Sequence, residues 1–212
     1  MYPPILVEVE GLDGTGKTWL ARRLTELITE YINEDRANHI RVEYAKEPWA
    51  TQAPRFTWQY PLEPRYAYAD ALALVADRVL HLEYLRATAS GAVVVMDRYH
   101  SSTLAYQYPW LREPQREELD RLIAPYLIEP VARVYLVPPE HRISEAHRRS
   151  NLPWPVFAEA YAKYVELAED IGRYTRNPPI VVPPVWMMDD PEAEARRIAR
   201  EIVEEVVATV SW

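Results

Sequence analysis

The chain has 212 residues, of which 49% are hydrophobic and 26% charged, and these proportions suit a single globular domain over residues 1–212. Its formal net charge of −8 argues against a nucleic-acid partner, because binding a polyanion requires a basic surface. The lack of cysteine excludes disulfides and thiolate metal sites, and no apolar run is long enough to span a bilayer. Since a core strand is predicted directly after Met1, we expect a cytoplasmic protein without a membrane partner.

A phosphate-binding loop is predicted near the start of the chain. An apolar run at residues 5–9 predicts a buried strand, and a helical pattern begins at Lys17. Between them, residues 11–18 match G-x-x-x-x-G-K-[ST]. Glycines let successive backbone N–H groups turn toward one phosphate, and the helix N-terminus adds its positive dipole end. Lys17 is expected to reach the β- and γ-phosphates of ATP, and the Thr18 hydroxyl to ligate Mg²⁺. The alternative is a glycine-rich turn followed by an ordinary surface lysine.

The predicted nucleotide-binding set follows from this motif. It comprises Gly11, Asp13, Gly14, Thr15, Gly16, Lys17 and Thr18.

The rest of the chain alternates between helical and strand patterns. Prolines and aromatic residues without a period occupy residues 49–64, which predicts a loop. Pro109 is expected to end a helix, and residues 151–155 are predicted to be non-helical. The predicted strands are residues 5–9, 39–45, 92–96, 131–137 and 185–188. The predicted helices are residues 18–31, 66–88, 101–108, 114–123, 139–149, 156–174 and 191–207.

This alternation predicts an α/β fold with a parallel sheet of about five strands and helices on both faces. Right-handed crossovers bring the carboxyl ends of parallel strands to one edge, where open α/β sheets bind ligands. Phosphate-binding and metal-binding residue types follow four strands in turn. They lie at residues 10–17, 46–48, 97–99 and 141–149.

Asp97 and Arg98 directly follow the most apolar of the predicted strands. A carboxylate at such a strand end, beside a phosphate loop, can hold Mg²⁺ directly or through water. Its alternative role is to cap the next helix. Arg98 can clamp a second phosphate with two hydrogen bonds, and its alternative is a salt bridge with a neighbouring acid.

Four motifs together resemble the thymidylate kinases, a family of P-loop nucleoside monophosphate kinases. They are E-G-L-D-G-T-G-K-T at residues 10–18, E-P at 47–48, A-D-R at 76–78 and D-R-Y-H-S-S-T-L-A-Y-Q at 97–107. A weaker likeness extends from residues 139–149 to the closing helix. The resemblance implies the three-layer fold of P-loop NTPases, a short lid at about residues 139–155, and a homodimer.

The resemblance also implies a reaction, the transfer of the ATP γ-phosphoryl group to dTMP with Mg²⁺, giving dTDP. Asp13 would then meet the acceptor 3′-OH and the metal shell, while Arg98 and Pro48 would hold the acceptor phosphate. Arg78 and Thr103 would face the pyrimidine, and Tyr106 would lie under the sugar and exclude a 2′-OH. As alternatives, Arg78 is a solvated helix residue and the Thr103–Tyr106 spacing is a packing face.

The chain departs from the family pattern at three places. Leu74 stands where the family usually has an aromatic residue that stacks on thymine, and Trp49 begins the segment where the family has G-G-T. The lid lacks the usual Asp-Arg pair, so Arg148 and Arg149 are the candidates to neutralise the transferring phosphoryl group. Their alternative, shared with Arg142, is a plain surface cluster. The predicted catalytic residues are Lys17, Asp97, Arg98, Arg148 and Arg149.

Two other functions stay open at this point. The first is a kinase for another pyrimidine monophosphate or for a deoxynucleoside, for which Leu74 is the reason. The second is a nucleotide-binding regulator without useful turnover, which the altered lid would suit.

Overall fold

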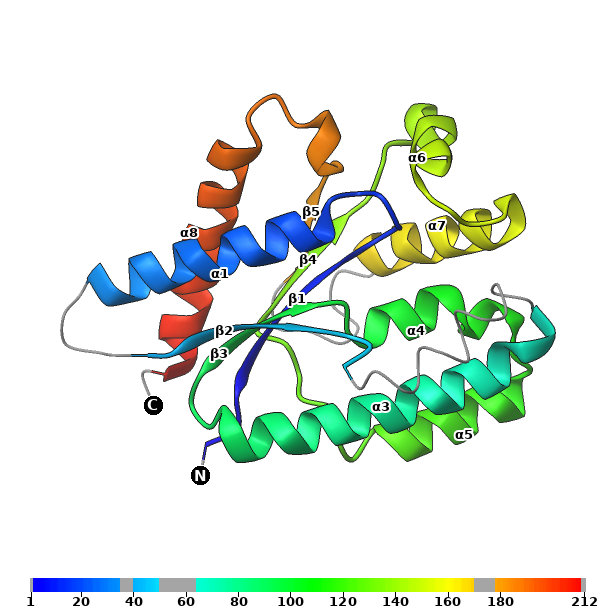
Figure 1. Ribbon diagram of the computed structural model, residues 1–212, viewed down its shortest axis with the longest axis horizontal. Helices are drawn as coiled ribbons and strands as arrows, with labels where there is room; N and C mark the ends of the chain where they lie inside the picture. The colour runs from blue at the N-terminus through cyan, green and yellow to red at the C-terminus, as the bar shows by residue number, and fades with distance from the viewer. Residues whose placement is uncertain (1, 35–39, 50–63, 170–177, 211–212) are drawn as a thin grey trace.

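The computed structural model describes residues 2–34, 40–49, 64–169 and 178–210. All the strands in this part of the chain form one parallel sheet in the order β2-β3-β1-β4-β5 (Figure 1). The prediction of a parallel α/β sheet of about five strands is therefore confirmed. The strands are β1 Ile5–Gly11, β2 Val42–Lys46, β3 Val93–Asp97, β4 Ala132–Leu136 and β5 Ile180–Val182.

Helices cover both faces of the sheet and make the three layers that the fold class requires. Helices α1 and α8 pack on one face, and α3, α4, α5 and α7 lie on the other (Figure 1). Helix α6 lies beyond the carboxyl edge of the strands (Figure 1). The helices are α1 Lys17–Glu34, α3 Ala67–Thr88, α4 His100–Tyr106, α5 Glu113–Ile123, α6 Ile143–Arg149, α7 Trp154–Glu169 and α8 Pro191–Val210.

Side chains of β1 alternate between these two layers. Val7 and Val9 pack in the core against α1 and α8, whereas Leu6 packs with α3 on the opposite face. Successive side chains of a strand point to opposite faces, so Glu8 and Glu10 share the face of Leu6. Both glutamates are buried, at 1% and 0% exposure. The sheet therefore carries two carboxylates on the face covered by α4.

The prediction of a strand at residues 185–188 was wrong. Val185–Met187 form a short 3-10 helix, and the last strand is Ile180–Val182, which pairs with Val134, Tyr135 and Leu136 of β4. Pro183 and Pro184 separate the two segments. Proline has no N–H to donate to a sheet ladder, so the strand ends before them and cannot resume directly after them.

Several predicted boundaries also differ from the observed ones. Helix α7 begins at Trp154 with Pro155 in its first turn, so the prediction that residues 151–155 are non-helical was wrong at its end. Proline is tolerated there because the first N–H groups of a helix have no partner within it. The predicted helix 139–149 is split into a 3-10 turn, Glu140–Arg142, and α6.

Pro109 does not act as the predicted stop. Helix α4 already ends at Tyr106, and Pro109 lies inside the following 3-10 helix Tyr108–Trp110. Strand β2 begins at Val42, three residues later than predicted. Most of the predicted loop 49–64, and the end of the predicted helix 156–174, fall outside the described residues.

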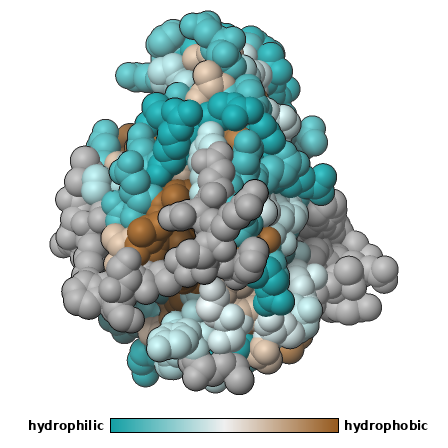
Figure 2. Space-filling model, turned by 90° about the vertical axis from the view of Figure 1, so that its left-hand side faces the viewer, coloured by the Kyte–Doolittle hydropathy of each residue, from teal (hydrophilic) through white to brown (hydrophobic). Residues whose placement is uncertain are grey.

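The described helices include none that is long and apolar enough to cross a membrane. Figure 2 shows one face of the molecule, where hydrophilic residues cover much of the described surface. An apolar area lies left of its centre.

Candidate active site

The predicted phosphate loop connects β1 to α1 and packs closely against the rest of the site. Gly14 and Gly16 have φ angles of +79° and +95°, a region that side chains disfavour. A Cβ on Gly14 would lie 2.5 Å from the carbonyl oxygen of Arg149, and one on Gly16 would lie 2.6 Å from Val185 Cβ. Glycine is therefore required at these two positions for both conformation and space.

Lys17 begins α1 and is 6% exposed. Its Nζ donates to the carbonyl oxygen of Leu12 at 2.6 Å and lies 4.0 Å from the Asp13 carboxylate. Burial, together with the positive charge of Arg98, lowers the pKa of Lys17 to about 7. An ammonium group held in this way lacks a strong anionic partner, which a bound phosphate would supply.

Asp97, at the end of β3, faces Thr18 of the phosphate loop. Thr18 Oγ1 donates to Asp97 Oδ2 at 2.5 Å, and the Tyr44 hydroxyl donates to the same oxygen at 3.0 Å. Lys46 Nζ lies 3.4 Å from both Asp97 Oδ2 and Thr18 Oγ1. Asp97 Oδ1 is buried and has no hydrogen-bond partner among the described residues.

The contacts of Asp97 do not include the helix cap considered as its alternative role. Helix α4 has Tyr99 at its N-cap and no side-chain cap at that residue, so Asp97 does not cap it. Mg²⁺ prefers oxygen ligands and often takes only one or two from the protein. The orphaned Asp97 oxygen and the Thr18 hydroxyl, which gives its proton to Asp97, fit such an ion. The described residues contain no cluster of three or more His, Cys, Asp or Glu side chains suited to a metal.

Arg98 is placed between the phosphate loop and α4. Its guanidinium forms an ion pair with Asp13, donates to Ser102 Oγ at 3.0 Å and lies 5.4 Å from the centre of the Tyr106 ring. The salt bridge considered as the alternative thus exists within the predicted site. Its partner is Asp13, a residue predicted to bind the acceptor.

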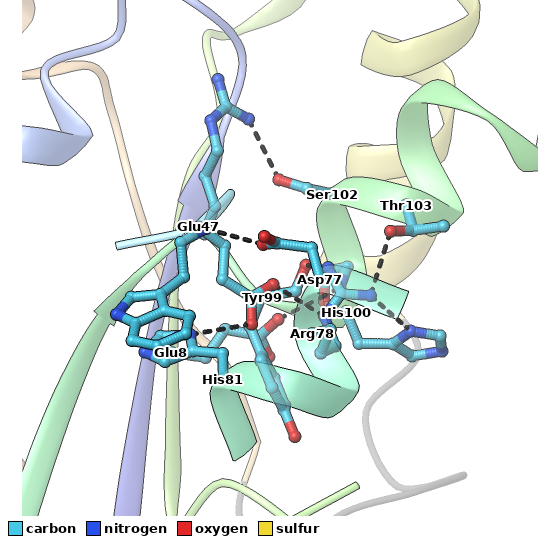
Figure 3. Close-up of polar contacts among 12 residues, drawn as sticks. Glu8, Glu47, Asp77, Arg78, His81, Tyr99, His100, Ser102 and Thr103 are labelled. Carbon is cyan, nitrogen blue, oxygen red and sulfur yellow. Dashed lines mark hydrogen bonds and ion pairs between the residues drawn. The ribbon is translucent and has the colours of Figure 1, made fainter. Parts of the chain in front are cut away.

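Arg78 lies at the centre of a buried polar cluster (Figure 3). It is 2% exposed, and its Nε donates to Glu47 at 2.7 Å. One Nη donates to Thr103 Oγ1 at 3.1 Å and lies 3.4 Å from His100 Nδ1, and the other donates to the Tyr99 carbonyl at 2.8 Å. Arg78 is therefore not the solvated helix residue considered as its alternative.

The remaining predicted acceptor residues lie on the segments that contribute to this cluster. Leu74 is half-buried on α3, one helical turn before Arg78, and Pro48 follows a cis peptide bond after Glu47. Tyr106 is 6% exposed, and its hydroxyl oxygen has no hydrogen-bond partner within the described part of the chain. The Thr103–Tyr106 spacing therefore places polar atoms on this face and is more than apolar packing.

The two arginines predicted to belong to a lid occupy different surroundings at the end of α6. Arg149 donates to Glu145 at 3.2 Å, and its guanidinium lies 4.3 Å from the centre of the Trp186 ring. The Trp186 indole N–H donates to the Gly14 carbonyl at 3.1 Å. Arg148 is exposed and makes no hydrogen bond or ion pair with the described residues. Trp186 thus contacts both the end of α6 and the phosphate loop.

Comparisons with known proteins agree with this geometry. A family model described as thymidylate kinase matches residues 9–177. The chain belongs to the thymidylate kinase family. It is 38% identical over 104 residues to a probable thymidylate kinase of Staphylothermus marinus, covering 47% of each chain. It is 38% identical over 109 residues to the thymidylate kinase of Xanthomonas oryzae pv. oryzae, which is 49% of this chain and 44% of that protein. It is 37% identical over 110 residues to the thymidylate kinase of Xanthomonas campestris pv. campestris, which is 49% of this chain and 44% of that protein.

The chain spans about half the length of the curated thymidylate kinases it matches. Family membership therefore comes from the match over residues 9–177.

Sequence reasoning missed several members of the site. Glu47 was noted only as part of an E-P motif, yet it holds Arg78, and its Oε1 lies 3.4 Å from His81 Nδ1. Gln107 is 4% exposed, and its Oε1 has no partner among the described residues. Trp186 was predicted to lie in a strand. The available signal for Glu47 was its place at the carboxyl end of a predicted strand, directly before Pro48, and Trp186 had none.

Proposed function

We propose that the chain is a thymidylate kinase, which transfers the γ-phosphoryl group of ATP to dTMP and gives dTDP. One observation carries the proposal: the phosphate loop, the Asp97–Thr18 pair and the buried Arg78–Thr103 pair lie along one edge of the sheet. Phosphoryl transfer requires from the protein mainly positioning and charge neutralisation. At this edge the Asp13 carboxylate lies between two cations, Lys17 and Arg98. The relatives named above carry the same activity in their names.

In this proposal the donor binds at the phosphate loop. Backbone N–H groups of residues 11–18 surround the phosphates, and Lys17 exchanges its bond to the Leu12 carbonyl for phosphate oxygens. Thr18 and Asp97 would hold Mg²⁺ through a hydroxyl oxygen and the orphaned Oδ1. When bound, the ion neutralises charge on the phosphates.

The acceptor would lie between α3 and α4. Arg98 exchanges its ion pair with Asp13 for the acceptor phosphate, and Pro48 borders that phosphate, while Asp13 meets the 3′-OH. Arg78 uses four of its five N–H groups within the described residues, and the fifth would be the donor to a pyrimidine carbonyl. Leu74 and Tyr106 form apolar surfaces beside the base and the sugar.

These contacts predict an order of acceptors. Buried donors at Arg78 and Thr103 favour a carbonyl at position four of the base, so dCMP should react poorly. Tyr106 under the sugar leaves no room for a 2′-OH, so UMP should also react poorly. Because Leu74 replaces an aromatic residue, dTMP should exceed dUMP by less than about a hundredfold.

A coupled assay of ADP release tests the proposal with ATP, Mg²⁺ and each of dTMP, dUMP, dCMP, UMP and thymidine. We expect release that depends on dTMP and is lost in Lys17→Ala, whose circular dichroism should match the wild type. ADP release with thymidine alone would indicate a deoxynucleoside kinase, and nucleotide binding without turnover would indicate a regulator. Equal rates with UMP or dCMP would overturn the acceptor assignment while leaving the donor site intact.

The assembly and place of action are part of the same proposal. We infer one domain over residues 1–212, a homodimer, and a cytoplasmic location. The single sheet supports one domain, and the family resemblance supports the homodimer. Sedimentation velocity at several protein concentrations tests the dimer, which would give twice the mass of 24.7 kDa.

A further inference from the structure

Glu10, the residue directly before the phosphate loop, is buried beneath the start of α4 at 0% exposure. Its Oε1 accepts from the backbone N–H groups of Tyr99 at 2.7 Å and Ser102 at 2.9 Å. Its Oε2 accepts from Ser102 Oγ and from the Tyr164 hydroxyl, both at 2.8 Å. One carboxylate therefore joins three elements: β1, the N-terminus of α4, and α7 behind it. Free N–H groups and the helix dipole favour a negative charge at this place.

The same carboxylate reaches Arg98 through one serine. Ser102 gives its hydroxyl proton to Glu10, so the lone pairs of Ser102 Oγ remain for Arg98, whose Nη donates to it at 3.0 Å. Hydrogen bonds that involve charged groups are stronger than neutral ones, and a chain of them polarises each member. The chain Glu10–Ser102–Arg98 therefore fixes where the guanidinium points.

The backbone at Arg98 needs support of its own. Its φ is +74°, in the left-handed region, which is strained for a residue with a Cβ. Such a conformation persists only where its surroundings impose it. Hydrogen bonds do so on both sides: Arg98 N–H donates to the Val9 carbonyl at 3.1 Å, and Tyr99 N–H donates to Glu10.

We propose that Glu10 is a positioning residue of the acceptor site, which orients Arg98 through Ser102 and through the backbone that follows Arg98. The inference rests on the proposed function in one respect, that Arg98 holds the acceptor phosphate. Glu10 itself is buried and touches no substrate. Its role is to keep the guanidinium in place when the ion pair with Asp13 is exchanged for a phosphate.

Glu8 provides a matched control. It lies two residues earlier on the same strand face and is 1% exposed. Like Glu10 it accepts from an N–H of the α4 N-terminus, that of Ser101 at 3.2 Å. Its other oxygen accepts from Arg133 at 3.1 Å, on the neighbouring strand β4. Among the described residues no hydrogen bond connects Glu8 to Ser102 or Arg98. Glu8 therefore shares with Glu10 the burial and the hydrogen bond to the α4 N-terminus, but not the hydrogen-bonded connection to Arg98.

The test compares Glu10→Gln with Glu8→Gln in steady-state kinetics. Glutamine keeps the shape and can still accept both backbone N–H groups, but its NH₂ donates to Ser102, which removes the charge and competes for the serine lone pairs. Glu10→Gln should raise the KM for dTMP about tenfold, the scale of one charge-assisted hydrogen bond, with a smaller change in kcat. The Kd of ATP should change less than about twofold in the same variant, and Glu8→Gln should leave both constants unchanged.

A double-mutant cycle separates positioning from general support. If Glu10 acts through Ser102, Ser102→Ala should also raise the KM for dTMP. The KM of the double variant should then rise by less than the product of the two single increases. Equal effects of Glu10→Gln and Glu8→Gln, or parallel losses of dTMP and ATP binding, would overturn the inference. The inference would also be overturned if the KM increases of the two single variants multiplied in the double variant.

A measurement without substrate makes the two proposals distinguishable. The side-chain ¹⁵N resonances of Arg98, assigned by comparison with Arg98→Lys, report whether its guanidinium is held. They should broaden or average in Glu10→Gln and Ser102→Ala but not in Glu8→Gln. If this holds while dTMP is not phosphorylated, the proposed function fails and the role of Glu10 stands. If dTMP is phosphorylated and Arg98 is unaffected in Glu10→Gln, the role of Glu10 fails alone.

Discussion

Replacement of Arg78 by methionine should destabilise the fold strongly, and the structure indicates why. Arg78 and Glu47 form a buried pair with an Nε–Oε2 distance of 2.7 Å, and their side chains are 3% and 5% exposed. Methionine fills much of the space of the arginine stem but leaves the Glu47 carboxylate without its cation. The second Glu47 oxygen keeps a contact of 3.4 Å with His81 Nδ1.

The size of the effect follows from burial. Removal of one partner from a buried ion pair costs about 3–5 kcal/mol, because the other charge stays uncompensated in a poorly solvated place. For a domain of this size, each kcal/mol corresponds to about 2–4 °C in Tm, so Arg78→Met should lower Tm by about 6–20 °C. In Arg78→Met with Glu47→Gln both charges are absent, and the double variant should recover at least about 2 kcal/mol.

Guanidinium chloride unfolding followed by circular dichroism measures these differences, with Glu47→Gln alone completing the cycle. The reasoning is refuted if Arg78→Met loses less than about 1 kcal/mol, or if the double variant is no more stable than Arg78→Met. The double variant also isolates the functional role, since it should fold while the preference for dTMP over dCMP is lost.

Three further predictions concern the metal, a buried acid and the lid. Asp97→Asn should lower the rate at least about tenfold and raise the Mg²⁺ concentration needed for half-maximal activity, and an unchanged Mg²⁺ requirement would contradict the metal assignment. Burial and a neighbouring carboxylate raise the pKa of Glu8 from 4.5 to about 7, so the folded state retains a proton that the unfolded state releases, and Glu8 lowers stability as pH rises through that range. The stability of Glu8→Gln relative to the wild type should therefore increase between about pH 5 and pH 7 in urea titrations, and a constant difference would disprove this. Arg148→Ala and Arg149→Ala should lower kcat more than they raise the acceptor KM, whereas small, equal changes would indicate a plain surface cluster.

The features that the sequence predicted well are local ones. The phosphate loop depends on residues 11–18, whose glycines, lysine and threonine are neighbours in the chain. Strand β3 was predicted from a continuous apolar run, because a strand buried on both faces needs apolar residues at nearly every position. Strand β1 was predicted from the largely apolar residues 5–9. Asp97 was assigned to the edge of the sheet from its place at the end of such a run.

The last strand shows where local patterns fail. Residues 180–182 and 185–187 are both short apolar runs between prolines, and the sequence alone offers no means of choosing between them. The first run forms the strand, because Ile180–Val182 extends beside β4 and pairs with it. The second is placed on the phosphate loop instead, where Val185 N–H donates to the Thr15 carbonyl at 2.8 Å.

The buried polar network is the part that only the tertiary structure decided. The V-E-V-E pattern of β1 is compatible with a strand whose glutamates face solvent, yet both glutamates lie under α4. Glu10 and Tyr99 are far apart in the chain and meet because β1 and β3 are adjacent parallel strands whose carboxyl ends coincide. Sequence therefore determined which chemical groups stand at the strand ends, since that depends on short-range pattern. Which of those groups bond to one another depends on strand order and helix packing, and these arise from burial summed over the whole chain.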